Sequence, residues 1–324
     1  MEGKNVLITG GLGFIGSNLA RRLVQERANV TVLDSLIPEY GGNPRNLHDI
    51  KEQVVINLSD VRDPFSMNQL VQGQDYLFNL AGQTSHLDSM ETPFTDLDIN
   101  AKAQLCILEA CRIHNPEIRI VFASTRQIYG KPQYLPVDEK HPCHPVDVNG
   151  VNKMAGESYH IVYNNAYGIS ASVLRLTNTY GPRMRIKDAR QTFLGIWIRN
   201  LLEGKPIHVY GDGRQRRDYN YVDDVVDALL LAGTKPDAEG KIFNLGASEP
   251  MTLDDTAKLM CELIDGANYE KIPFPEDRQA IDVGDFICDY HAFEKAFGWT
   301  PKVGFAEGIE RSLQYFREEL EHYL

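Results

Sequence analysis

The glycine-rich segment Gly10–Gly16 constrains the fold of this chain more than any other feature of its sequence. A β-branched apolar run, Asn5–Thr9, precedes it, and a segment with helical periodicity, Phe14–Glu26, follows it. Glycines at positions 10, 13 and 16 allow a tight turn that brings a helix N-terminus close to the end of a strand. The free N–H groups and the positive dipole end of such a helix bind a pyrophosphate. The segment therefore predicts a strand, a turn and a helix that hold a dinucleotide.

Short apolar runs alternate with helix-length amphipathic segments through the first half of the chain. Near-continuously apolar strands that alternate with helices form parallel sheets covered on both faces. The sequence thus predicts an α/β fold, a doubly wound parallel sheet of the Rossmann type. The expected strands are Asn5–Thr9, Val30–Leu33, Val54–Leu58, Tyr76–Leu80, Arg119–Ala123 and Ser172–Leu176, and the main expected helices are Phe14–Glu26, Ile99–Ile113 and Gly150–Tyr167.

The regular alternation ends after Leu176, where loops rich in Gly, Arg and Asp begin. The helices expected there, without regular strand partners, are Gln191–Glu203, Thr252–Ile264 and Phe305–Tyr323. A helix at Val222–Ala232 and a strand at Ile242–Leu245 indicate a return to the main sheet. We therefore predict a cofactor domain and a smaller, discontinuous α/β substrate domain. The predicted boundaries are 1–176 plus 221–245 for the first and 177–220 plus 246–324 for the second.

Asp34 stands at the end of the second expected strand, where dinucleotide-binding domains carry the acid that contacts the adenosine ribose. Its carboxylate can accept hydrogen bonds from the ribose hydroxyls but repels a 2′-phosphate. The next residues, Ser35 and Leu36, supply no compensating cation. The expected cofactor is therefore NAD, in preference to NADP.

Motifs along nearly the whole chain occur in the order and spacing of one known family. The glycine spacing is G-x-x-G-x-x-G, and the further matches are Asp60–Asp63, Leu80–Gly82, Ser124–Thr125, Ile128–Gly130, Leu135–Glu139, Arg175–Arg183 and Arg217–Asp224. With these motifs the chain resembles the extended short-chain dehydrogenase/reductases, in particular nucleotide-sugar epimerases and dehydratases of the UDP-glucose 4-epimerase kind. No single motif is specific, but their order and spacing together are.

The resemblance assigns residues to two ligands. It implies that a nucleotide-diphosphate sugar binds through Arg126, Asn178, Arg217 and Arg278, since a diphosphate needs charge-assisted donors. The alternative is that Arg217 and Arg278 only pair with acids on this acidic chain. The cofactor residues implied by the resemblance and by the glycine turn are Gly10, Gly13, Phe14, Ile15, Gly16, Asp34, Ser35, Asp60, Val61, Leu80, Ala81, Gly82 and Lys153.

The family's catalytic residues are a serine or threonine, together with a tyrosine and a lysine spaced Y-x-x-x-K on one helix. The lysine lowers the tyrosine pKa, so that the tyrosinate takes the sugar hydroxyl proton as hydride leaves the carbon. Thr125 and Lys153 match these positions, but the tyrosine position is Asn149. An amide accepts no proton near neutral pH. The chain therefore departs from the family at its acid–base residue.

Three interpretations of Asn149 are open. In the first, another group or a water beside Asn149 and Lys153 acts as the base, with Lys153 itself and His86 as candidates. In the second, Asn149 orients the sugar hydroxyl while a weaker base serves. In the third, catalysis is lost and the fold only binds its ligands. The retained Thr125 and Lys153 favour an active enzyme, whereas His86 can equally be a hydrogen-bonded structural residue.

The two residues after Thr125 narrow the reaction. Family 4,6-dehydratases carry an Asp-Glu pair there and related decarboxylases a Glu, whereas this chain has Arg126 and Gln127. Without those carboxylates, loss of water or of carbon dioxide lacks its usual residues. We expect an NAD-dependent nucleotide-sugar epimerase that acts at C4 through a transient 4-keto sugar. A 4-dehydrogenase that releases the keto sugar, and a silent NAD or nucleotide-sugar-binding protein, are the alternatives.

Composition favours a cytoplasmic protein without nucleic-acid or membrane partners. The net charge of −12 disfavours binding to nucleic acid or anionic membranes, and no run approaches about 20 apolar residues. Five cysteines without a C-x-x-C pair fit a reducing compartment. No metal site is expected, because His141 and His144 flank a Pro-Cys pair without a shared ligand face. By resemblance, the helices Ile99–Ile113 and Gly150–Tyr167 pair across a two-fold axis into a four-helix bundle, which implies a homodimer.

Overall fold

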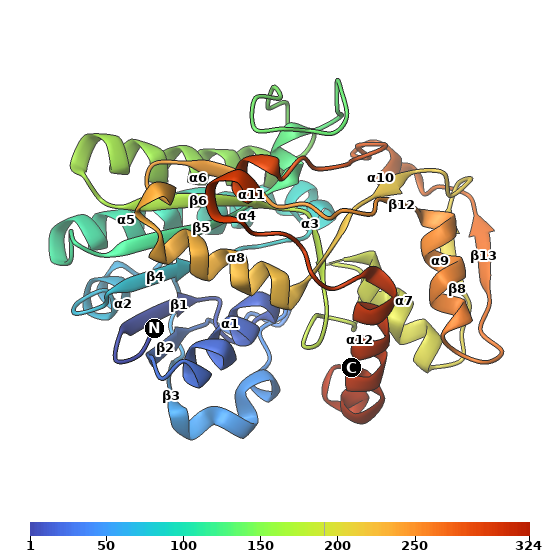
Figure 1. Ribbon diagram of the computed structural model, residues 1–324, viewed down its shortest axis with the longest axis horizontal. Coiled ribbons are helices and arrows are strands. Elements are labelled where there is room, and N and C mark those ends of the chain that lie inside the picture. The colour runs from blue at the N-terminus through green and yellow to red at the C-terminus, as the bar shows by residue number, and fades with distance from the viewer. Residues whose placement is uncertain (191) are drawn as a thin grey trace.

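The computed structural model describes residues 1–190 and 192–324. Its largest element is a seven-stranded parallel sheet in the order β3-β2-β1-β4-β5-β6-β11 (Figure 1). The strand order reverses between β1 and β4, and doubly wound sheets bind their ligands at the carboxyl ends of the strands at this point. The strands are β1 (Asn5–Thr9), β2 (Asn29–Leu33), β3 (Val54–Asn57), β4 (Tyr76–Asn79), β5 (Arg119–Thr125), β6 (Ala171–Leu176) and β11 (Ile242–Asn244).

Strand β1 shows why both faces of the sheet are buried. Val6 and Ile8 point to the face that helices α1 and α8 cover, and Leu7 points to the face covered by α2 and α5. All three side chains are fully buried. Helices α5 and α6 lie side by side in Figure 1, and α1 packs against α8. These helices are α1 (Phe14–Gln25), α2 (Pro64–Leu70), α5 (Ala103–His114), α6 (Val148–Tyr167) and α8 (Val222–Thr234).

The chain leaves the main sheet after β6 and returns to it with α8 and β11. Strand β11 pairs in parallel with β6, Phe243 opposite Leu174, and completes the sheet. This confirms the doubly wound α/β fold. The predicted domain boundaries stay a prediction.

The part of the chain between and after these elements has its own core, formed by side chains such as Leu194, Ile198, Leu313 and Phe316. The expectation that its helices lack strand partners is wrong, because β8 and β13 pair in parallel beside α9. The first residue of the expected helix Gln191–Glu203 lies outside the described residues. The elements are β7 (Asn178–Tyr180), β8 (Ile207–Tyr210), β9 (Arg216–Arg217), β10 (Tyr219–Tyr221), β12 (Met251–Thr252), β13 (Tyr269–Ile272), α7 (Phe193–Leu202), α9 (Leu253–Glu262) and α12 (Phe305–Glu319).

Short helical segments connect the longer elements. The expected helix Ile99–Ile113 consists of a π-helical turn, Asp98–Lys102, followed by α5. The others are α3 (His86–Glu91), α4 (Pro93–Leu97), α10 (Glu276–Gln279), α11 (His291–Phe297) and the 3₁₀ turns Pro44–Gln53, Arg126–Tyr129, Pro236–Ala238 and Leu320–His322. Within residues 1–190 and 192–324, no helix has both the length and the apolar character needed to cross a membrane.

Candidate active site

The turn after β1 brings α1 against the end of the strand. Gly10 has a left-handed φ of +68°, and a Cβ on Gly16 would lie 2.2 Å from the Gly10 carbonyl oxygen. Residue 16 therefore has to be glycine if the helix is to approach this closely. Gly13 is the N-cap residue of α1 and has no side chain to cap it, and the first turn carries no acidic residue. The free N–H groups at this N-terminus fit the pyrophosphate of a dinucleotide.

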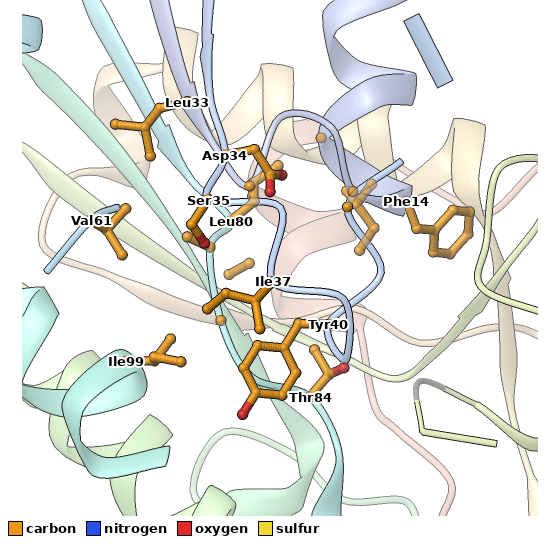
Figure 2. A pocket seen from close by; sticks show the side chains of 18 of the residues that line it. Phe14, Leu33, Asp34, Ser35, Ile37, Tyr40, Val61, Leu80, Thr84 and Ile99 are labelled. Carbon is orange, nitrogen blue, oxygen red and sulfur yellow. The ribbon is translucent and has the colours of Figure 1, made fainter. Parts of the chain in front are cut away.

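A cavity with about 850 Å³ of empty space, partly open to solvent, lies over this turn at the carboxyl edge of the sheet (Figure 2). Lys153, the remaining predicted cofactor residue, lies behind the wall, where its Nζ donates to the carbonyl of the lining residue Ala123 at 3.1 Å. The predicted residues that line the cavity are Gly10, Gly13, Phe14, Ile15, Gly16, Asp34, Ser35, Asp60, Val61, Leu80, Ala81 and Gly82.

Asp34 follows β2 and lines the cavity beside Ser35 (Figure 2). Its Oδ2 accepts the N–H of Leu12 at 3.1 Å and its Oδ1 accepts the N–H of Leu36 at 2.9 Å. Burial raises the pKa of Asp34, and these two backbone donors oppose that rise. Leu36 itself has a left-handed φ of +50°. The cavity lining, taken over the described residues, contains no lysine or arginine that could balance a 2′-phosphate.

The predicted catalytic residues Lys153 and Thr125 come from two different elements. Thr125 is the last residue of β5, and its Oγ1 accepts the N–H of Gln127 at 3.2 Å. Lys153 projects from α6, is 6% exposed, and places its ammonium 4.9 Å from the centre of the Phe122 ring. Burial lowers the pKa of Lys153 to about 8, opposed by the negative charge of Asp96. The lysine is thus a desolvated cation at the cavity wall.

Asn149 lies on α6, one turn before Lys153, and is 2% exposed. Its Nδ2 donates to the carbonyl of Gln83 at 2.8 Å and to Oδ2 of Asp96 at 3.1 Å. Asp96 is fully buried and also accepts from the amides of Asn100, at 3.0 Å, and Asn152, at 2.8 Å. The amide of Asn149 is therefore one of three that satisfy a buried carboxylate.

His86 is the first residue of α3 and lies beside Asp147, the N-cap residue of α6. Nδ1 of His86 is 3.0 Å from Oδ2 of Asp147, which also accepts Nε2 of Gln127 at 2.8 Å. Burial by itself raises the pKa of Asp147, but His86, Gly150 and Gln127 outweigh it and hold that pKa below its ordinary value. The side chain of Asp147 is fully buried, whereas that of His86 is 38% exposed.

Of the four residues predicted to bind the sugar nucleotide, Arg126 and Arg217 lie among charged groups. Arg126 stacks on Phe286 with 5.0 Å between its guanidinium and the ring centre, and burial followed by the charge of Arg217 lowers its pKa to about 10. Arg217 is 6% exposed, donates to the Gly284 carbonyl, and lies 3.5 Å from Asp282.

The other two residues predicted to bind the sugar nucleotide contact uncharged groups. Nδ2 of Asn178 donates to the carbonyl of Asp218 at 3.0 Å. The guanidinium of Arg278 lies 5.5 Å from the centre of the Tyr210 ring. The structure brings Arg126 and Arg217 together, and substrate contact by any of the four residues stays a prediction.

Two acids of the site, Asp96 and Asp147, escaped the sequence prediction. Asp147 stands shortly before the expected helix Gly150–Tyr167, and aspartate is a common N-cap residue. That signal reveals its capping role but not its proximity to His86. Asp96 carries no local signal, because its three amide partners come from α6 and the π-helical turn.

His141 and His144 lie in the loop that precedes α6. Nε2 of the buried His141 accepts the N–H of Gln133 at 2.8 Å, and its Nδ1 lies 2.8 Å from the Pro142 carbonyl. In the part of the chain that the structure describes, no three His, Cys, Asp or Glu side chains are grouped to hold a metal ion.

Comparison with known proteins places this geometry in a family. Residues 6–246 match the NAD dependent epimerase/dehydratase family. A putative UDP-glucose 4-epimerase of Methanocaldococcus jannaschii is 33% identical over 96% of this chain and 98% of its own length. UDP-glucuronic acid decarboxylase 1 of Xenopus tropicalis is 31% identical over 98% of this chain and 73% of its own length.

A solved structure shares the whole fold. UDP-glucose 4-epimerase of Thermotoga maritima, crystallised with UDP-glucose, superposes with a TM-score of 0.88 at 31% identity, over 98% of this chain and 99% of that one. The match extends from the glycine turn through the region that follows the sheet. The chain therefore belongs to the NAD dependent epimerase/dehydratase family and is an enzyme that uses NAD.

Proposed function

We propose that this chain is a nucleotide-sugar epimerase that inverts C4 of a hexose through a transient 4-keto sugar. The observation that carries the proposal is the buried ammonium of Lys153, bonded to Ala123 at the wall of the cofactor cavity. The similarity to UDP-glucose 4-epimerases over nearly the full chain supports it.

Bound NAD would accept a hydride from the sugar carbon and return it to the opposite face. Lys153 would hold the nicotinamide ribose and keep positive charge beside the reacting hydroxyl. Thr125, at the end of β5, would donate its hydroxyl hydrogen to the reacting oxygen, since its Oγ1 already accepts from Gln127. These roles place a cation and a donor around one sugar oxygen.

The residues after Thr125 favour epimerisation over elimination. Arg126 and Gln127 stand where dehydratases carry their acid pair, so no carboxylate directly follows Thr125 to remove a C5 proton. Arg126 and its neighbour Arg217 provide positive charge for the diphosphate instead. The substrate we propose is therefore a nucleotide-diphosphate hexose.

We also propose a cytoplasmic homodimer. The five cysteines are free, which fits a reducing compartment. Apolar side chains on α5 and α6 are exposed, with Ile113 at 58%, Val151 at 48% and Val162 at 54%. A second copy of the chain would cover them through an isologous four-helix contact.

The experiment is incubation of the purified enzyme with UDP- and dTDP-linked hexoses, followed by proton NMR of the sugar anomeric signals. An epimerase converts one 4-epimer into a mixture without net change in NADH absorbance. Release of a keto sugar with accumulating NADH would identify the 4-dehydrogenase. Retention of NAD and nucleotide sugar in native mass spectra, with no product, would identify a binding protein.

A further inference from the structure

Oxidation of a sugar hydroxyl needs a group that accepts its proton, and Asn149 is not that group. Its buried amide donates to Gln83 and to Asp96, and an amide nitrogen has no basic lone pair. A residue that replaces the family tyrosine has to be basic, partly exposed toward the site, and held in a fixed orientation.

His86 is basic and partly exposed, and it lies 3.0 Å from a carboxylate that can orient it. Asn149 donates to the carbonyl of Gln83, three residues before His86, so one short segment links the tyrosine position to this imidazole. Thr84, in the same segment, lines the cofactor cavity. The side chain of His86 is 38% exposed, while its Nδ1 is buried against the carboxylate of Asp147.

Asp147 is itself held rigidly. Its Oδ1 accepts the N–H of Gly150 at 2.7 Å as the cap of α6, and its Oδ2 accepts Nε2 of Gln127 at 2.8 Å. The Nδ1–H direction of His86 is not aligned with Oδ2 in the structure, although the two atoms are 3.0 Å apart. The terminal torsion of a histidine is soft, so a modest ring rotation aligns them.

We propose that His86, oriented by Asp147, is the acid–base residue of this enzyme in place of the family tyrosine. The proposal rests on the epimerase function proposed above. Asp147 fixes Nδ1 as the protonated nitrogen, which leaves Nε2 as the basic one, and it stabilises the imidazolium that forms. Asp147 is a positioning residue in this scheme.

The two half-reactions balance in protons and electrons. In the forward half-reaction the O4–H bond breaks and its proton passes to Nε2 of His86. The C4–H bond also breaks, and its hydrogen leaves C4 with the electron pair as a hydride, which bound NAD would accept. In the return half-reaction the hydride adds to the other face of C4 and Nε2 returns the proton to O4. No further oxidant, reductant or co-reactant is required.

Lys153, the other candidate base, is better suited to remain a cation. Its Nζ donates to the Ala123 carbonyl and lies against Phe122, with Asp96 as counter-charge. Its pKa of about 8 leaves it mainly protonated at neutral pH, and an ammonium has no lone pair for a sugar proton.

The first test compares two variants of the full-length enzyme with wild type on a nucleotide sugar that the wild type epimerises. His86→Asn keeps an N–H donor toward Asp147 but cannot take up a proton, so turnover should fall at least 100-fold, within the range of about 10² to 10⁴ for general acid–base groups. KM and NAD content should stay within a few-fold of wild type. His86→Gly should lose the same activity and regain at least tenfold when imidazole is added.

The second test needs no turnover. In wild type labelled with ¹⁵N-histidine, proton NMR should show a downfield Nδ1–H signal of His86 that couples to nitrogen. Asp147→Asn should abolish that signal while keeping the helix cap, since asparagine caps as well as aspartate. The same variant should lower kcat at least tenfold with KM within a few-fold of wild type.

His291 provides a matched control, because its Nδ1 lies 2.6 Å from Asp289 but its side chain is 75% exposed. His291→Asn should leave turnover and the His86 signal unchanged. Turnover of His86→Asn within fivefold of wild type would overturn the proposal while leaving the epimerase function intact. A wild type that epimerises no nucleotide sugar would refute the proposed function, and a missing Nδ1–H signal would still refute the His86–Asp147 pair independently.

Discussion

The side-chain amide of Asn149 donates to Oδ2 of Asp96 across 3.1 Å, at the position where the sequence resemblance leads us to expect a tyrosine. Asp96 is fully buried and accepts from the amides of Asn149, Asn100 and Asn152. A buried carboxylate is tolerated when its oxygens are hydrogen-bonded. Asn149 therefore has a structural task that accounts for an amide at this position.

Restoring the family residue should for this reason damage the enzyme. Asn149→Tyr removes one donor from Asp96 and adds a ring to a buried site, and each effect costs about 1–3 kcal/mol. We expect a lower melting temperature and no gain in turnover. Asn152→Ala, which removes a different donor from Asp96 without adding volume, is the matched control for stability. A strong gain in turnover in Asn149→Tyr over a nearly inert wild type would show that the chain is a decayed relative.

Replacing Lys153 should separate stability from activity. Lys153→Met removes the only ammonium at the described cavity wall, so turnover should fall by orders of magnitude. The difference between the ordinary pKa of 10.5 and about 8 corresponds to a cost of about 3 kcal/mol for burying this charge. The variant should therefore unfold at a higher temperature than wild type at pH 7.

The pKa of Lys153 also predicts how the stability gained in Lys153→Met depends on pH. Below pH 8 both states of wild type carry the proton, and the folded state bears the full cost of the buried charge. Between pH 8 and 10.5 the unfolded state keeps a proton that the folded state has lost, so wild-type stability rises with pH. The advantage of Lys153→Met should shrink across this window in thermal unfolding scans. Lys102→Met, at a side chain that is 78% exposed, should show no such change.

Cofactor preference is a further prediction. The carboxylate of Asp34 should repel a 2′-phosphate, and no cation among the described lining residues offsets it, so NAD should bind at least 100-fold tighter than NADP. Fluorescence titration of cofactor-free enzyme with both nucleotides measures this ratio. Equal dissociation constants would disprove the role of Asp34. Asp212→Asn, at an exposed surface acid, should leave the ratio unchanged.

Arg126 should bind the sugar nucleotide and not NAD. Arg126→Gln removes a desolvated cation that is repelled by Arg217, and loss of a charged hydrogen bond costs about 1.5–3 kcal/mol. The dissociation constant for a nucleotide-diphosphate sugar should rise 10- to 100-fold in calorimetry, with NAD affinity unchanged. Arg214→Gln, at a side chain that is 87% exposed, should change neither constant. Equal weakening for both ligands would instead indicate a general structural role for Arg126.

The proposed dimer depends on the exposed apolar residues of α5 and α6. Val162→Glu should convert a homodimer into a monomer at micromolar concentration in light scattering, since a buried unpaired charge is costly at an interface. Phe65→Glu on α2, at a residue that is 75% exposed, should leave the assembly unchanged. A wild-type monomer under the same conditions would rule out the four-helix contact.

Local patterns predicted much of this molecule because they report local physics. The glycine turn, the apolar strands and Asp34 each follow from a short stretch, and the structure places twelve predicted cofactor residues around one cavity. The pairing of His86 with Asp147 joins residues on α3 and at the start of α6, and no short pattern encodes that distance. The parallel pair β8 and β13 was missed for the same reason, since its two strands are separated by α8, β11 and α9.

The late return of β11 to the sheet affects how the chain is made. All six residues of β6 are buried, but the partner along its outer edge is β11, and residues 177–241 are synthesised between the two. Until residue 244 leaves the ribosome, β6 presents an unpaired apolar edge, which is a template for aggregation. Translation that stalls in this interval should yield insoluble chains, and a shortened protein that ends after β6 should not be recoverable in soluble form.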